Sequence, residues 1–227
     1  MRNFFLFGLA LVTFGAMAQS HVPRGLTAPS DVAIESVANI TSGESFDSNA
    51  VEVDGIRFET LVSERVLTIP ANQPGVETPV KLGIRITNNT PTPLRFNFFN
   101  ALSPEIVAPH GQAVGRSHAS DKLLEPKESD FPLVMPKQSV TFFQDAKLSW
   151  RKGGNQLTLD ELALRVPDGI GGFWIFAALK PGTYQVRFRY ESYRTTVVIP
   201  KPEIRRLDGV WTGQVVTTFM EVSLVQP

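Results

Sequence analysis

The stretch Leu179-Lys180-Pro181-Gly182-Thr183-Tyr184, continuing as Gln185-Val186-Arg187-Phe188-Arg189-Tyr190, decides the fold of this chain. A Pro-Gly turn is followed at once by strict alternation of large apolar or aromatic residues with polar ones. Because successive side chains of a strand point to opposite faces, the pattern predicts a half-buried strand entered through a tight turn. We expect Leu179, Gly182 and Tyr184 to form a structural corner, with the Tyr184 hydroxyl bonded back to the turn.

Similar alternation recurs on both sides of this strand. Segments 56–62, 80–87, 140–150 and 195–199 carry it, and Met220, Val222 and Leu224 share one face of a final strand. Leu94, Phe96 and Phe98 follow the 88–93 turn, so we expect 80–87 and 94–98 to pair as antiparallel neighbours. Thr158 to Glu161 matches a helix capping box, which predicts one helical turn reaching Leu164. Short strands separated by turn signals predict an all-β sandwich.

Segment 173–179 is apolar on both faces. Phe173, Ile175 and Ala177 alternate with Trp174, Phe176 and Ala178. A strand that is buried on one side only would not have this composition. We therefore expect either the long segment 103–138 or the N-terminal arm to cover the second face. If the face of Trp174 and Phe176 is left uncovered, it is the kind of apolar patch that marks an interface.

Three parts of the chain precede or interrupt the predicted sheet. Residues 1–18 combine Arg2, an apolar run and the triplet Ala16-Met17-Ala18, which predicts a cleaved signal peptide. Residues 19–50 are predicted to be a poorly ordered arm with one docked piece around 32–37. Residues 51–227 are predicted to form a single domain, interrupted by a long irregular loop at about 103–138 that holds five Pro.

Composition narrows the classes of function. The chain has no Cys, so its core must hold without disulfides, and thiol chemistry is excluded. Its 22 basic and 22 acidic residues argue against nucleic acid as a partner, because such binding depends on an excess of Lys and Arg. No segment after the leader is long and apolar enough to span a membrane. We expect an exported, soluble protein in the periplasm or outside the cell.

Three pieces of the chain together resemble a known group of proteins. They are the strand and Asn turn Ile84-Arg85-Ile86-Thr87-Asn88-Asn89-Thr90, the corner at 179–184, and the closing strand after Trp211-Thr212-Gly213. They resemble bacterial exported immunoglobulin-like β-sandwich proteins that mostly carry no known activity, and are distantly similar to the bacterial intracellular proteinase inhibitor family. The resemblance spans about residues 80–225 and implies a Greek-key sandwich of about seven to nine antiparallel strands with at most short helical turns. No reactive-site motif of an inhibitor is matched.

Candidate site residues are few. If 94–99 and 184–190 are neighbours in one sheet, Arg95, Arg187 and Arg189 share its outer face and could bind a carboxylate or phosphate. Trp174 and Phe176 are the apolar binding candidates. His110, His118 and Asp121 are weak metal candidates, because their spacing matches no known ligand pattern. No cofactor and no catalytic residue is predicted.

Three functions remain open at this point. The first is a non-catalytic exported protein that binds a protein, an envelope glycan or another copy of itself. The second is an inhibitor of an exported protease that inserts loop 103–137. The third, which is ranked last, is a metal-dependent hydrolase.

Overall fold

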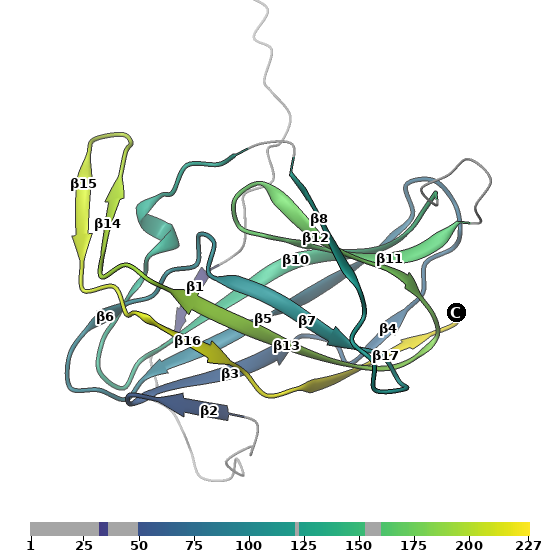
Figure 1. Cartoon of the computed structure of the whole chain (residues 1–227), viewed down its shortest axis with the longest axis horizontal. Coiled ribbons are helices and arrows are strands. Elements are labelled where there is room, and N and C mark those ends of the chain that lie inside the picture. The colour runs from purple at the N-terminus through teal and green to yellow at the C-terminus, as the bar shows by residue number, and fades with distance from the viewer. Residues whose placement is uncertain (1–31, 36–49, 121–122, 153–159) are drawn as a thin grey trace, which may run out of the picture.

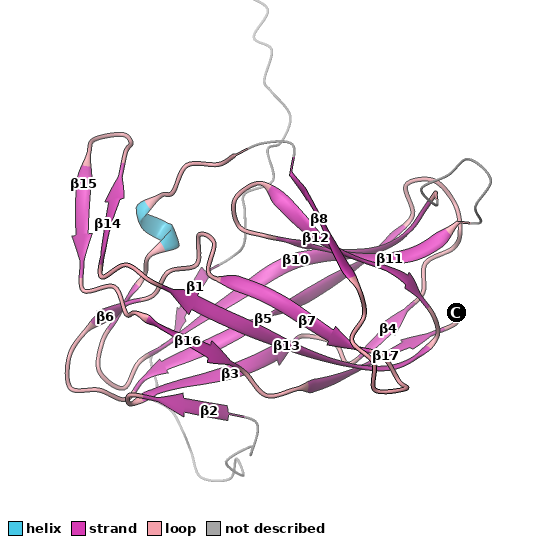
Figure 2. Cartoon of the chain, viewed as in Figure 1, coloured by secondary structure: helices cyan, strands magenta, loops and turns pink. Residues whose placement is uncertain are grey.

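A computed structural model describes residues 32–35, 50–120, 123–152 and 160–227 (Figures 1 and 2). The predicted signal peptide, Asp121 and most of the predicted arm lie outside these residues. Every described helix or strand is a strand except one 3-10 turn, η1 (Glu128–Asp130). The all-β prediction is therefore confirmed. No helix within the described ranges is long and apolar enough to cross a membrane.

The larger of two main sheets has the order β2-β3-β5-β10-β11-β12-β8, and β1 also pairs with β10. All of its pairings are antiparallel. Its strands are β1 (Val32–Glu35), β2 (Ala50–Val53), β3 (Ile56–Val62), β5 (Glu77–Asn88), β8 (Arg116–Ser120), β10 (Ser139–Arg151), β11 (Glu161–Pro167) and β12 (Gly172–Leu179).

The smaller main sheet is built around β13. One edge of β13 pairs with β7, and the other pairs with β16 and β17 in turn. The bounds are β7 (Leu102–Val107), β13 (Gly182–Ser192), β16 (Gly213–Val216) and β17 (Met220–Val225). The parallel neighbour of β17 is β4 (Val66–Thr68). Two short pairs complete the fold: β6 (Leu94–Arg95) with β9 (Leu133–Val134), and β14 (Thr196–Ile199) with β15 (Arg205–Asp208).

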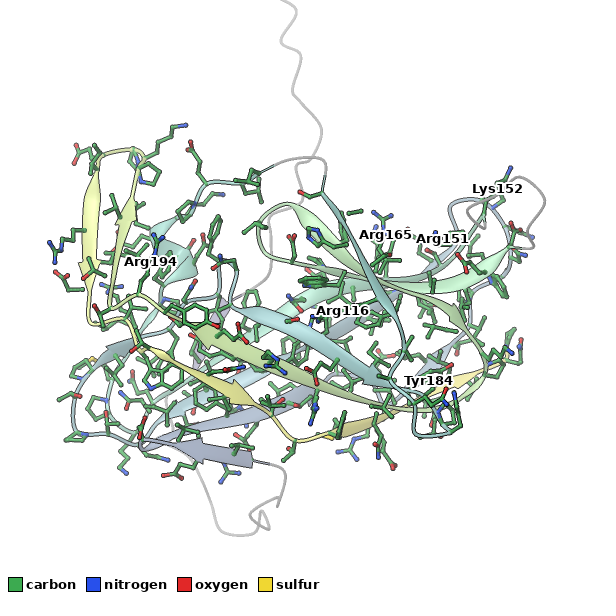
Figure 3. All side chains as sticks on the ribbon, viewed as in Figure 1. Arg116, Arg151, Lys152, Arg165, Tyr184 and Arg194 are labelled. Atoms are coloured by element: carbon green, nitrogen blue, oxygen red, sulfur yellow. The ribbon has the colours of Figure 1, made fainter. Side chains whose placement is uncertain are left out.

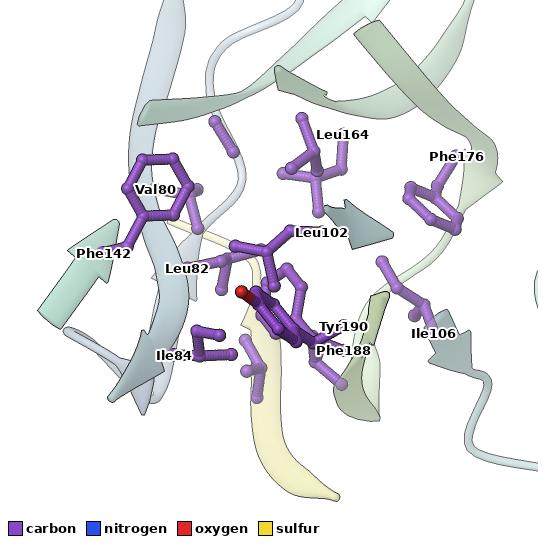
Figure 4. Close-up of a cluster of buried hydrophobic side chains, with 14 of the residues drawn as sticks. Val80, Leu82, Ile84, Leu102, Ile106, Phe142, Leu164, Phe176, Phe188 and Tyr190 are labelled. Atoms are coloured by element: carbon purple, nitrogen blue, oxygen red, sulfur yellow. The ribbon is translucent and has the colours of Figure 1, made fainter. Parts of the chain in front are cut away.

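The core lies between the two main sheets (Figure 4). The predicted inward face of β13 is buried as expected, and Val222 and Leu224 of β17 are buried with it. Facing them are apolar side chains of the larger sheet, among them Leu82, Ile84, Phe142, Leu164 and Phe176. The corner also forms: the Tyr184 hydroxyl donates to the Lys180 carbonyl and accepts from the Lys180 amide, both at 2.9 Å.

Two local expectations are wrong. β5 pairs with β3 and β10, so no edge of it is left for 94–98. Instead, the amides of Phe96 and Phe98 donate to the carbonyls of Pro132 and Asp130. The helical turn expected to reach Leu164 is also wrong over its described part, because Glu161–Pro167 is strand β11 between two partner strands. Pairing on both sides overrides the local capping signal.

The long segment is more regular than predicted. It supplies β7 to the smaller sheet, β8 to the larger sheet, and also η1 and β9. Its first half thus forms edge strands of both main sheets. The piece of the arm expected near 32–37 is present as β1, whose four residues pair with Ser139–Phe142 of β10.

Candidate functional site

Large apolar side chains that are exposed gather on two segments. Ten such side chains are found among the described residues, and seven of them lie in 123–135 or 193–204. We call these seven the hairpin surface: Leu123, Leu124, Leu133, Met135, Tyr193, Val198 and Ile204. Exposed fractions reach 84% for Leu123 and 82% for Ile204. Isolated exposed apolar residues are ordinary, but a concentration of them marks an interaction site.

The two segments of the hairpin surface are joined by a core of their own. Phe131 packs with Ile199, Leu207 and Val210 in a cluster separate from the main core. Alternation places Ile199 and Leu207 on the inner face of the β14–β15 hairpin, which leaves Val198 on the outer face. The hairpin stands away from both main sheets, with η1 beside it (Figures 1 and 2). The small core therefore holds the hairpin against segment 123–135.

Ion pairs bridge the same two segments. Lys201 Nζ lies 2.8 Å from Glu125 Oε2, and Arg205 Nη1 lies 3.0 Å from Glu128 Oε2. Arg194, at the base of the hairpin, is exposed (Figure 3). Charged groups thus lie on the same two segments as the exposed apolar side chains, and charged and polar residues are common at the rim of a protein interface.

Two titratable groups near this surface have shifted pKa values. Burial raises the pKa of Asp130, although the Lys127 amide that donates to its carboxylate at 2.7 Å partly offsets this. The hydrogen bond from the Tyr193 hydroxyl to the Glu191 carboxylate raises the pKa of Tyr193. Both shifts have local structural causes.

A second cluster lies at the edge formed by β8 and β12. His118 Nε2 is 2.7 Å from Oδ2 of the buried Asp168, whose Oδ1 accepts the amides of Ile170 and Gly172 at 2.9 and 2.8 Å. The His118 ring packs on Trp174 with a centroid distance of 4.8 Å. Asp168 can lie this close to the backbone of residue 172 only because that residue is Gly: a Cβ there would lie 2.5 Å from Asp168 Oδ2.

Arg116 ties this edge to the other sheet (Figure 3). Its guanidinium lies 4.5 Å from the centroid of the Trp174 ring and donates to Ser103 Oγ and to the Pro104 carbonyl of β7. The first half of the long segment therefore covers Trp174, which was one of the two alternatives left open by the sequence. We interpret the cluster as a latch between the sheets, because its side chains bond to one another.

The two apolar candidates have different places. Phe176 is 1% exposed and faces the main core, so the condition set for an apolar surface patch, an uncovered face, is not met at Phe176. Trp174 is half-buried beneath Arg116 and His118. The outward residues of β12 are instead Phe173, Ile175 and Ala177, and Arg165 stacks on Phe173 at 4.5 Å. A bulge opposite Leu162–Leu164 makes Leu179, rather than Ala178, the next inward residue.

The three arginine candidates do not form one group. The premise that 94–99 neighbours β13 is wrong, and Arg95 donates to the Phe131 carbonyl instead. Arg187 and Arg189 do share the outer face of β13, where both pair with Glu105 at 2.7 and 3.4 Å. Burial raises the pKa of Glu105, but the two arginines outweigh it and the pKa is lowered overall. This shared carboxylate competes with any anionic ligand.

The two described histidines among the metal candidates bond to different partners. His118 bonds to Asp168, whereas His110 bonds to Gln112 at 3.2 Å. Asp121 lies outside the described residues. Within the part of the chain that the structure describes, no group of three or more His, Cys, Asp or Glu is placed to hold a metal ion.

Sequence reasoning missed two features of these sites. Asp168 was not among the predicted site residues, and no signal in the sequence links it to His118 at a separation of fifty residues. The sequence did carry a signal for the hairpin surface, because Ile204 and the pair Leu123-Leu124 are apolar residues within charged segments. Comparisons with protein-family models, with curated proteins and with solved structures found no match for this chain.

Proposed function

We propose that this chain is an exported, non-catalytic binding protein that docks a partner protein through the hairpin surface. The observation that carries this proposal is that, among the described residues, seven of the ten exposed large apolar side chains lie on two adjoining segments. Neither segment is part of the main sheets. When a partner covers apolar side chains that the fold leaves exposed, the removal of their surface from water stabilises the complex by roughly 25 cal/mol per Å².

The proposed architecture is an immunoglobulin-like Greek-key sandwich. The bonds between Tyr184 and Lys180 support it, because a tyrosine that bonds back to its own turn is a hallmark of such folds. The two sheets that enclose one core also support it. In this architecture the sheets act as a scaffold, and binding falls to the segments between strands.

The test compares two variants, each with two exposed apolar residues replaced by Ser. The first carries Leu123→Ser and Ile204→Ser in the hairpin surface. The control carries Val66→Ser and Val225→Ser, which are exposed apolar residues on the smaller sheet. Each protein is cross-linked in the native envelope fraction, and the captured proteins are identified by mass spectrometry.

We expect the wild type and the control to capture the same partner, and the hairpin variant to lose it. Equal capture by all three proteins would refute the hairpin surface as the docking site. Recovery of a protease that the chain inhibits would instead favour the inhibitor alternative. The same spectra test export, because a mature protein should begin at Gln19, and an intact Met1 on the exported form would contradict the proposed cleavage.

A further inference from the structure

A groove lies at the other end of the fold from the β14–β15 hairpin, as the places of Tyr184 and Arg194 show (Figure 3). It is formed by the turn that follows β7 and by the corner that enters β13, and we call it the corner groove. Its volume is about 450 Å³, and its lining includes Pro109, His110, Val114, Lys180, Pro181 and Tyr184. This volume is within the range of small-molecule sites, which span roughly 300–1,000 Å³.

Both walls of the corner groove are fixed by hydrogen bonds. In the first wall, the Ala108 amide donates to the Gln112 carbonyl, and the Val114 amide donates to the Ile106 carbonyl, each at 2.8 Å. In the second wall, the Tyr184 hydroxyl bonds both backbone groups of Lys180 (Figure 3 labels Tyr184). A ligand would therefore meet a formed site and would not have to order two free loops.

Pro109 of the first wall lies close to Gly182, which stands between Pro181 and Tyr184 of the second wall. Gly182 has φ +147°, and a Cβ there would lie 2.8 Å from Cγ of Pro109. Ala178, which also lines the groove, has φ +56°, in the left-handed region. Strained backbone of this kind persists where the surrounding structure holds it and is often found at binding sites.

The charge of the groove is positive. The Lys180 ammonium supplies this charge, and none of the lining residues among those described is acidic. No ion pair within the described ranges involves Lys180. The other lining residues are largely apolar, with Pro109 in the first wall and Pro181 in the second. Gln112, which bonds His110, adds one amide at the rim.

We propose that the corner groove binds a carboxylate that carries a short apolar body, with the ammonium of Lys180 as the principal contact for the carboxylate. The apolar body lies against Pro109 and Pro181, and His110 adds a second donor. Charged hydrogen bonds are about twice as strong as neutral ones, which makes the anion and not the apolar body the basis of selectivity. Two sources share this chemistry: a free organic acid and the C-terminal carboxylate of a peptide.

The experiment is a titration of the isotope-labelled full-length protein followed by NMR of its backbone amides. The probes are benzoate, hexanoate, an acetylated tripeptide ending in Val with a free carboxylate, and the amidated form of the same tripeptide. Neutral benzamide controls for binding of the apolar body alone. We expect the carboxylates to shift the amides of 108–114 and 178–184, and the neutral probes to leave them unchanged.

Three variants locate the contact. Lys180→Gln should weaken binding of the carboxylates by about tenfold, which corresponds to the loss of one charged hydrogen bond. Gly182→Ala would place a Cβ 2.8 Å from Cγ of the lining residue Pro109 and should displace that wall, which weakens binding of the larger probes. Lys81→Gln, which removes a lysine that pairs with Asp145 elsewhere, is the matched control and should bind as the wild type does.

The results separate the sources and can overturn the proposal. Binding of benzoate without the tripeptide assigns the groove to a free acid, and binding of the free-carboxylate tripeptide assigns it to a chain terminus. The absence of shifts at 10 mM of every carboxylate, or equal affinity in Lys180→Gln, would overturn the proposal. Capture of a partner by the hairpin surface is independent of these outcomes.

Discussion

Substitution of Phe131 by Ala should release the β14–β15 hairpin from the rest of the protein without unfolding the main sheets. Phe131 is 2% exposed and belongs to the small core with Ile199, Leu207 and Val210. No residue of that core is part of the main cluster. The loss of packing should therefore fall on the hairpin, which is the element that carries much of the proposed docking surface.

The expected increase in hairpin opening follows from comparing the packing that is lost with the ion pairs that remain. Truncation of a buried Phe to Ala typically costs about 3–5 kcal/mol. The ion pairs Lys201–Glu125 and Arg205–Glu128 remain in the variant, but exposed pairs contribute only about 0.2–1 kcal/mol each. The pairs are too weak to replace the lost packing. At 1.4 kcal/mol per tenfold change, local opening of the hairpin should become roughly 100- to 4,000-fold more frequent.

Hydrogen exchange measures this opening directly, because amides report the free energy of the smallest opening that exposes them. The amides shared by β14 and β15 should exchange faster by that factor, while the slowest amides of β5, β10 and β13 keep their rates. Phe176→Ala, in the main core, is the control and should accelerate the slowest amides. An equal acceleration everywhere in Phe131→Ala, or none in the hairpin, would refute the independence of the small core.

The remaining predictions concern the latch, the corner and the outer face of β13. Gly172→Ala should lower the free energy of unfolding by about 1–3 kcal/mol in urea titrations, since the added Cβ would lie 2.5 Å from Asp168 Oδ2. A variant as stable as the wild type would contradict the latch. Tyr184→Phe removes both bonds to Lys180 and should cost about 1–3 kcal/mol by the same measurement, and a cost below a few tenths would show that the corner contributes little. The lowered pKa of Glu105 means that its stabilising contribution is present above the pKa of an unfolded glutamate, about 4.3, and is lost as the pH falls through the folded value. Glu105→Gln should therefore flatten the acid dependence of the urea midpoint below about pH 4, and an unchanged dependence would remove Glu105 as a cause.

Faces of strands were predictable because they depend on local order alone. The inward residues of β13 and β17 follow from a period of two along each strand, and the structure buries all of those in β13 and, in β17, Val222 and Leu224, while Met220 at the start of β17 is only partly buried. The hydrogen bonds of Tyr184 were likewise within reach of the sequence, since the partner lies only four residues away. The absence of Cys required that the core hold without disulfides, which its burial of large apolar side chains achieves.

Partners of strands were not predictable by the same reasoning. Leu94 follows β5 closely in the sequence, yet it pairs with Val134, because both edges of β5 are occupied by β3 and β10. The long segment likewise read as irregular, because β7 and β8 are stabilised by strands far along the chain. Which strands pair depends on competition among all strands for the available sheet edges, so it cannot be predicted from the sequence of any one segment.

The all-β class, the inward side chains of the clearest strands and the corner before β13 could be read from the amino-acid order, because each depends on residues within a few positions of one another. Three contacts became visible only in the folded chain: Arg116 and His118 cover Trp174, Glu105 joins Arg187 to Arg189, and Phe131 attaches a hairpin with exposed apolar side chains. These contacts join segments tens of residues apart, and their distances are set by how the two sheets pack around one core.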